Sequence, residues 1–119
     1  MASVVIAHVV LFRPKPELSD DDRRALVVAF ETALREIPSI RQARVGRRVT
    51  HGRGYEQLMR VDYDYAAIIE FDDAAGLRTY LEHPAHEQLG QRFFLTFEEA
   101  LMYDFELSDS AEGLGVLLT

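Results

Sequence analysis

The sequence predicts an α+β fold of the ferredoxin-like type, with elements in the order β-α-β-β-α-β and one antiparallel sheet covered by helices on one face. Two observations predict it. Segments with strand-like composition or alternation are separated by segments whose apolar residues recur at helical spacing. The chain has 119 residues, 48% of them hydrophobic and 28% charged, which is the size and composition of one globular domain.

The first half supplies a strand, a helix and a second strand. The unbroken run VVIAHVVLF at 4–12 is rich in β-branched residues and predicts a strand covered on both faces. Ser19 is a suitable helix N-cap, three aspartates follow it, and apolar residues recur at helical spacing as far as Ile37. Pro38 ends this helix. Residues 40–50, IRQARVGRRVT, alternate and predict the second strand.

The second half supplies two more strands and a broken helix. Residues 51–60 contain two glycines and predict a loop. Residues 62–71 predict the third strand, residues 72–81 a short helix, and Pro84 the first turn of another helix. Residues 100–107 predict the fourth strand. The helix that begins at Pro84 is expected to bury Leu89, Phe93, Phe94 and Phe97.

One face of the predicted sheet is apolar but has no helix to cover it. The first strand, 4–12, is apolar on both faces, and the third strand keeps Ala66 and Ile68 on the face opposite its tyrosines. An uncovered apolar face indicates an interface, and a second copy packed sheet to sheet would cover it. We therefore expect a homodimer.

Composition excludes several classes of protein. The net charge of −7 argues against a nucleic-acid partner, and the absence of cysteine excludes disulfides, thiol nucleophiles and thiolate metal sites. No run reaches the length of a membrane span, and the apolar N-terminus lacks the basic start of a signal peptide. We expect a soluble, cytoplasmic protein with no membrane partner.

The stretch YLEHPAH, residues 80–86, carries the candidate chemistry. Tyr80 falls in the last turn of one predicted helix, and His86 falls in the first turn of the next. The positive end of a helix dipole favours a neutral imidazole, which can act as a base, while a buried phenol can donate a hydrogen bond to an oxyanion. The pair suits proton abstraction beside a carbonyl without a cofactor. The alternative is a structural corner, in which His83 caps the turn and Tyr80 belongs to the core.

A metal site is the weaker interpretation of these histidines. His83 and His86, with Glu82 and Glu87 beside them, offer nitrogen and oxygen donors. Their spacing differs from H-E-x-x-H, and Pro84 interrupts the helix that would align the two imidazoles. We expect no metal and no cofactor.

The sequence resembles the stress-responsive α/β-barrel domain (Dabb) family of the dimeric α/β-barrel superfamily. The resemblance rests on HVVLF at 8–12, on Gly46, and on IIEFDDAAGLRTYLEHPAH at 68–86. It covers roughly residues 3–107. It implies a ferredoxin-like subunit that pairs its sheet with that of a second copy, and a cavity between sheet and helices that could hold a small molecule.

The family includes a plant polyketide cyclase, and the resemblance implies roles for individual residues. It places the catalytic pair of that enzyme on Tyr80 and His86, and a histidine of its first strand on His8. A further histidine of its third strand is replaced here by Tyr65, so the substrate is expected to differ. We assign substrate binding to His8, Tyr65 and His83.

Three functions remain open at this stage. The first is a cofactor-independent cyclase, lyase or isomerase acting on a carbonyl or polyketide-like substrate. The second is a non-catalytic stress-responsive or ligand-binding dimer, and the third is a cofactor-free monooxygenase.

The last residues form an extension to the predicted domain. The domain spans 1–107, and the extension spans 108–119, with a polar hinge followed by the apolar run LGVLLT. Exposed leucine and valine side chains forgo roughly 1.5 kcal/mol or more of burial each. We expect the extension to dock on a partner subunit or along a sheet edge.

Overall fold

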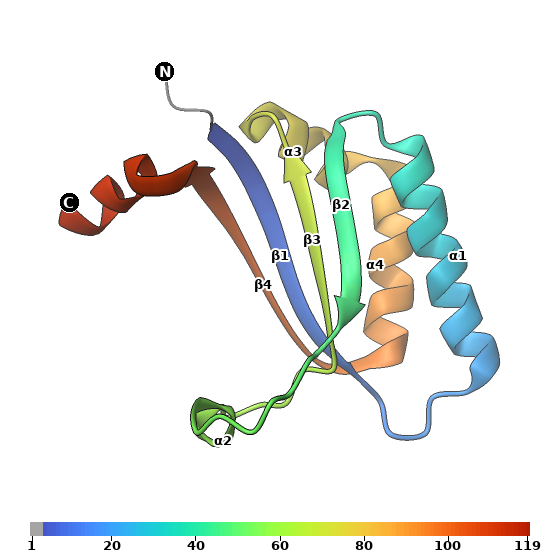
Figure 1. The fold of residues 1–119 in the computed structure, drawn as a ribbon. Helices are drawn as coiled ribbons and strands as arrows, with labels where there is room; N and C mark the ends of the chain where they lie inside the picture. Colours follow the sequence, from blue (N-terminus) through green and yellow to red (C-terminus); the bar gives the residue numbers. More distant parts are fainter. Residues whose placement is uncertain (1–3) are drawn as a thin grey trace.

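The computed structural model describes residues 4–119, and residues 1–3 of the predicted domain lie outside the described part. The chain forms one sheet and one layer of helices, followed by a projecting C-terminal segment (Figure 1). In chain order the elements are β1 (Val4–Pro14), α1 (Asp20–Glu36), β2 (Ile40–Arg47), α2 (Tyr55–Leu58), β3 (Tyr65–Phe71), α3 (Ala74–Glu82), α4 (Pro84–Thr96), β4 (Phe97–Ser108) and η1 (Ser110–Leu118).

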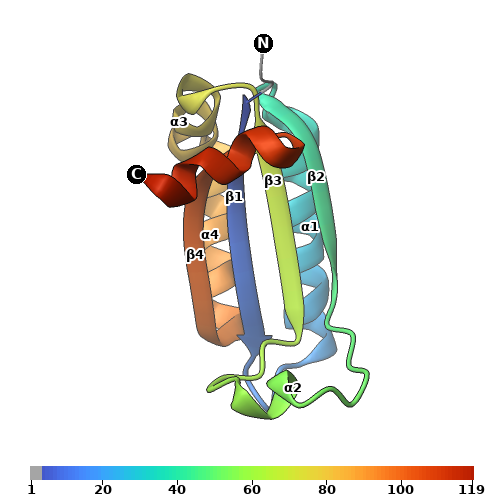
Figure 2. The ribbon, with the colours of Figure 1, turned by 60° about the vertical axis from the view of Figure 1, so that its left-hand side comes forward.

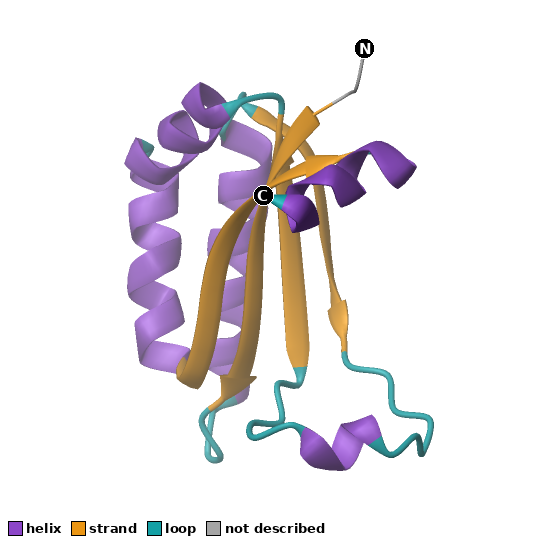
Figure 3. Ribbon diagram, turned by 90° about the vertical axis from the view of Figure 1, so that its left-hand side faces the viewer, coloured by secondary structure: helices purple, strands orange, loops and turns teal. Residues whose placement is uncertain are grey.

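The sheet has four strands in the order β2-β3-β1-β4, and all neighbouring pairs are antiparallel. Helices α1, α3 and α4 cover one face of it (Figure 3). This confirms the ferredoxin-like arrangement. The register pairs Val9 of β1 with Ile68 on one side and with Tyr103 on the other.

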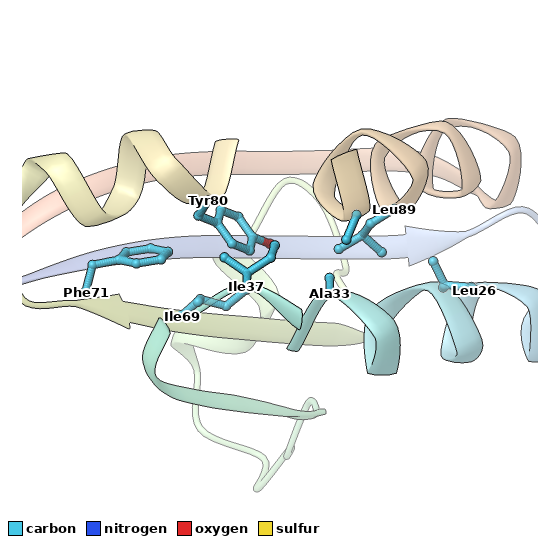
Figure 4. Packing of buried hydrophobic residues seen from close by; sticks show 8 residues of the cluster. Leu26, Ala33, Ile37, Ile69, Phe71, Tyr80 and Leu89 are labelled. Carbon is cyan, nitrogen blue, oxygen red and sulfur yellow. The ribbon is translucent and has the colours of Figure 1, made fainter. Parts of the chain in front are cut away.

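The core lies between the sheet and the helices. Alternate residues of β1 and β3 face the helix layer, and Ile69 and Phe71 of β3 are fully buried there. Tyr80 of α3 and Leu89 of α4 extend from the helices toward these strands (Figure 4). Burial of several large apolar side chains at one place fixes how α3 and α4 sit on the sheet.

The helix layer of α1, α3 and α4 leaves the opposite face of the sheet uncovered, as the sequence predicts. We call it the open face. Its exposed apolar side chains include Ile68 of β3 and Tyr103, Phe105 and Leu107 of β4, which are between 40% and 57% exposed. This explains why the first strand is apolar on both sides: one side faces the helix layer, and the other belongs to the open face.

The junction of α4 and β4 differs from the prediction. Phe94 was expected in the core but is 78% exposed, and Phe97 begins β4 and does not belong to the helix. The Thr96 hydroxyl donates to the Arg92 carbonyl at 2.7 Å, at the last turn of α4. Since successive helical residues differ by about 100° in direction, only Phe93 of the adjacent pair can face Phe12 of the sheet, with a ring-centroid separation of 5.3 Å.

The loop 51–60 differs from the prediction, and the C-terminal extension forms a helix. The loop 51–60 contains the short helix α2, and β3 begins at Tyr65, three residues later than predicted. The C-terminal extension forms the 3-10 helix η1, whose apolar side chains are exposed in the single chain. Docking of the extension on a partner stays a prediction.

Candidate functional site

The candidate site is built at the break between α3 and α4. His83 is both the C-cap of α3 and the N-cap of α4, where its Nδ1 accepts a hydrogen bond from the Ala85 N–H at 3.0 Å. Pro84 occupies the first turn of α4, where its missing N–H costs nothing. The break places Tyr80 and His86, which belong to different helices, side by side, with ring centroids 4.6 Å apart.

Tyr80 is anchored in the core. It is only 2% exposed, and its ring packs against Phe71 with centroids 5.2 Å apart. Burial raises the pKa of the Tyr80 hydroxyl to about 12, because the phenolate would lose its hydration. Within residues 4–119 the hydroxyl has no hydrogen-bond partner. The phenol is therefore a protonated donor near neutral pH, with its hydrogen bond available to a ligand.

His86 is held in its neutral form. Burial is the main cause that lowers the pKa of its imidazole below 6.5, and the nearby charge of His8 lowers it further. An interaction with the Leu81 backbone acts in the opposite direction. A neutral imidazole has a free lone pair, so His86 has the protonation state that a general base requires near pH 7.

His8 completes the group from the sheet. Its ring lies 5.8 Å from that of Tyr80, and its Nδ1 donates to the Asp104 carboxylate at 2.6 Å. The imidazole N–H is the donor because a carboxylate oxygen accepts. This hydrogen bond joins β1 to β4, fixes the ring orientation of His8 and leaves Nε2 as its second polar atom.

These three side chains share one cavity of about 140 Å³ between the sheet and the helices. The remaining lining is apolar. It comprises Val10, Phe30, Ala67, Ile69, Leu89, Gly90, Phe93, Phe94 and Met102. Phe94 both lines the cavity and is mostly exposed, so it lies at the solvent side. Because the rest of the cavity is apolar, its few polar groups can act on a ligand with little competition from water.

Two of the sequence-predicted residues lie elsewhere. His83 does not line the cavity, since its ring is used in capping α4. Tyr65 faces the helix layer near Phe12 and lines a separate cleft between α1 and β2. The structure therefore brings together His8, Tyr80 and His86 but leaves His83 and Tyr65 outside the group.

Asp104 is the functional candidate that sequence reasoning missed. The sequence feature that could have indicated it is its position: Asp104 is a charged residue on the same face of β4 as Ala100 and Met102, the face toward the helix layer. Which residue of β1 it meets depends on the β1–β4 register, where Asp104 lies opposite His8.

The described part of the chain, 4–119, holds no group of three or more histidine, aspartate or glutamate side chains placed to bind a metal ion. Over the same residues no helix is long and apolar enough to cross a membrane.

The protonation state of His86 gives a direct test of the site. We expect the NMR titration of its imidazole to give a pKa below 6.5, whereas the same histidine in urea-unfolded protein titrates at about 6.5. The unfolded state then binds the proton more readily, so this group stabilises the fold fully above 6.5 and loses that contribution as pH falls through the folded pKa. A folded pKa above 6.5 would contradict the buried, neutral imidazole.

The fold and the cavity define a ferredoxin-like α+β protein with a tyrosine and two histidines between sheet and helices. The model of the Stress responsive A/B Barrel Domain (Dabb) matches residues 6–107, and the chain belongs to this family. An uncharacterized protein of Streptomyces coelicolor is 31% identical over 104 residues, covering 86% of this chain and 99% of the relative. Olivetolic acid cyclase of Cannabis sativa is 20% identical over 102 residues, covering 86% of this chain and 96% of the enzyme.

Solved structures show the same fold. A dimeric ferredoxin-like protein of unknown function from Thermobifida fusca superposes with a TM-score of 0.69 at 22% identity, covering 88% of this chain and 92% of the other. Hydroxynitrile lyase from Passiflora edulis gives a TM-score of 0.71 at 17% identity, covering 89% and 95%. The match to the family ends at residue 107, so the C-terminal extension, 108–119, lies outside it.

Proposed function

We propose that this protein is a cofactor-independent lyase, cyclase or isomerase that acts on a small carbonyl compound. The observation that carries the proposal is the shared cavity, which sets a neutral imidazole beside a protonated phenol whose hydroxyl has no hydrogen-bond partner within residues 4–119. The cyclase and lyase among its distant relatives support the same class of chemistry.

In the proposed step, His86 removes a proton from the carbon next to the carbonyl. The electron pair of that C–H bond moves into the developing enolate, and the proton stays on the imidazole. Tyr80 donates a hydrogen bond to the enolate oxygen, and His8, oriented by Asp104, supplies a second polar contact. The proton on His86 is then returned to the product, so the cycle balances without a cofactor.

The size of the cavity limits the substrate. Its volume of about 140 Å³ is below the about 300–1,000 Å³ typical of sites for drug-sized ligands. The proposed substrate is therefore small, with its carbonyl at Tyr80 and an apolar remainder against Phe30 and Leu89.

We also infer that the protein is a homodimer joined through its open faces. Apolar side chains on β3 and β4 are exposed in the single chain, and burying them against a second copy removes them from water. Related ferredoxin-like proteins described as dimeric support this arrangement.

A second candidate is a non-catalytic binding dimer. It is favoured by an apolar cleft of about 460 Å³ between α1 and β2, lined by Phe12, Leu26 and Phe30 among others. An apolar ligand could occupy this cleft without meeting Tyr80 or His86, neither of which lines it.

The experiment that separates the candidates is hydrogen exchange at carbon. Small ketones, aldehydes and β-keto esters are incubated with the protein in D₂O, and deuterium entry beside the carbonyl is followed by NMR. We expect the protein to accelerate exchange for at least one compound, because proton removal is the first proposed step. The variant His51→Asn, altered at an exposed histidine of the loop before α2, is the matched control and should retain the rate. Saturable binding with no accelerated exchange across the panel would favour the non-catalytic dimer.

A further inference from the structure

Two arms project from the open face of the sheet, at opposite ends of its strands. The C-terminal arm, residues 109–119, contains η1 and crosses in front of the strands at one end (Figure 2). The loop arm, residues 48–64, joins β2 to β3 and contains α2 at the other end. Figures 1 and 3 place both arms on the side of the sheet away from the helix layer.

The direction of the C-terminal arm is set by a close backbone contact. A Cβ built on Gly113 would lie 2.9 Å from the Ser108 carbonyl oxygen, closer than side-chain carbons approach. Glycine therefore allows η1 to fold back against the end of β4. The arm leaves the sheet in a defined direction.

Both arms expose apolar side chains that nothing in their own subunit covers. Leu117 and Leu118 of the C-terminal arm are 77% and 90% exposed, and Val49 and Leu58 of the loop arm are 78% and 76% exposed. These side chains lie beyond the two ends of the proposed dimer interface, so a second copy seated on the open face reaches them. Contact between them would remove both apolar sets from water.

The two arms differ in charge. The C-terminal arm carries Asp109 and Glu112 and no basic residue. The tip of the loop arm, residues 51–60, carries Arg53 and Arg60 with one acid, Glu56, whose carboxylate accepts the backbone N–H groups of His51 and Gly52. As a whole the loop arm, 48–64, carries three arginines and three acidic residues and so has no net charge, whereas two C-terminal arms would bring acidic groups together. Contact between unlike arms is therefore favoured.

We propose that the C-terminal arm of each subunit docks on the loop arm of a second copy of this chain. This inference rests on the proposed homodimer. It requires the two-fold axis to run across the strands, because the arms lie at opposite ends of the sheet and only that axis places unlike arms together. Each subunit is then held at both ends, and the interface extends past the family domain, which ends at residue 107.

The absence of cysteine makes the docking testable by site-specific cross-linking. A tagged copy carrying Leu117→Cys is mixed and re-equilibrated with an untagged copy carrying Leu58→Cys, and a short bis-maleimide is added. We expect a covalent pair of mixed mass in this sample, and little in samples of either variant alone. The control pairs Leu117→Cys with Val28→Cys, an exposed position on α1 in the helix layer, and should give none.

Each other outcome overturns the proposal in a distinguishable way. Cross-linking of Leu117→Cys mainly to itself means that like arms meet, with the axis along the strands. Dimers in light scattering without any 117–58 product leave the homodimer standing and remove the docking. Monomers in light scattering remove both. As a second readout, deletion of residues 109–119 should weaken dimer affinity by about tenfold or more, through lost apolar burial, and unchanged affinity would also overturn the docking.

Discussion

Replacing His86 with asparagine is expected to slow carbon–hydrogen exchange by about 10²–10⁴-fold, the usual contribution of a positioned general base. Asparagine is polar and fits the half-buried position, but it has no basic lone pair. The Tyr80 hydroxyl remains in place, so binding of the carbonyl should change less than the rate. The measurement is the initial rate of deuterium incorporation into whichever small carbonyl compound the wild-type protein turns over.

The pH dependence of the wild-type rate supplies an independent check on this variant. Since burial keeps the pKa of His86 below 6.5, the rate should fall as the solution becomes more acidic, with a midpoint below pH 6.5. The Tyr80 hydroxyl, with a pKa raised to about 12, should cause no loss before strongly alkaline pH. A His86→Asn variant that folds normally and keeps the wild-type rate would exclude His86 as the base.

Much of the fold could be predicted because its signals are local. The cap at Ser19 is observed, with its hydroxyl accepting from the Asp22 N–H at 3.1 Å, and Pro84 opens α4 as expected. The two-sided apolarity of the first strand also led directly to the open face. These features depend on neighbouring residues alone, and periodicity reports them without knowledge of tertiary contacts.

The predictions were wrong where tertiary contacts determine the element boundaries and which side chains are buried. Helix and strand meet without a loop at Thr96 and Phe97, so the apolar run around them contains both helical and alternating spacing. Phe97 packs on Phe12 with ring centroids 4.6 Å apart, and this contact belongs to the sheet. The exposure of Phe94 follows from the packing of its neighbours Phe93 and Phe97 against the sheet. Short elements such as α2 have too few residues for a periodic signal.

For a related reason, only part of the candidate site could be predicted from the sequence. Tyr80 and His86 are close in sequence, and a proline between two helices indicates that they face one another across the break. His8 was assigned from the family resemblance, but its hydrogen bond to Asp104 spans 96 residues and depends on the pairing of β1 with β4. No local pattern reports such a register. The cavity itself depends on how α4 packs, which the sequence does not show.

The second prediction with a large expected effect concerns the open face. Substituting Ile68 with arginine is expected to convert the proposed dimer to monomers at micromolar concentration. Ile68 lies on a central strand, paired with Val9 of β1 and with Arg44 of β2, so the new charge would lie among apolar groups and beside a like charge. Burying an unpaired charge costs about 3–5 kcal/mol, which corresponds to at least a hundredfold loss of affinity. The two-fold axis places this substitution in the interface twice.

Sedimentation velocity or light scattering across a concentration series measures the effect. The single chain already leaves Ile68 40% exposed, so Ile68→Arg should keep its fold, which circular dichroism would verify. The matched control is Val28→Arg, which adds the same charge at a 59% exposed position on α1, away from the sheet, and should remain dimeric. Equal dimer affinity in the two variants would show that the open face is not the interface. Loss of dimer in Ile68→Arg alone would locate the interface there, because the variants differ only in which layer of the fold carries the charge.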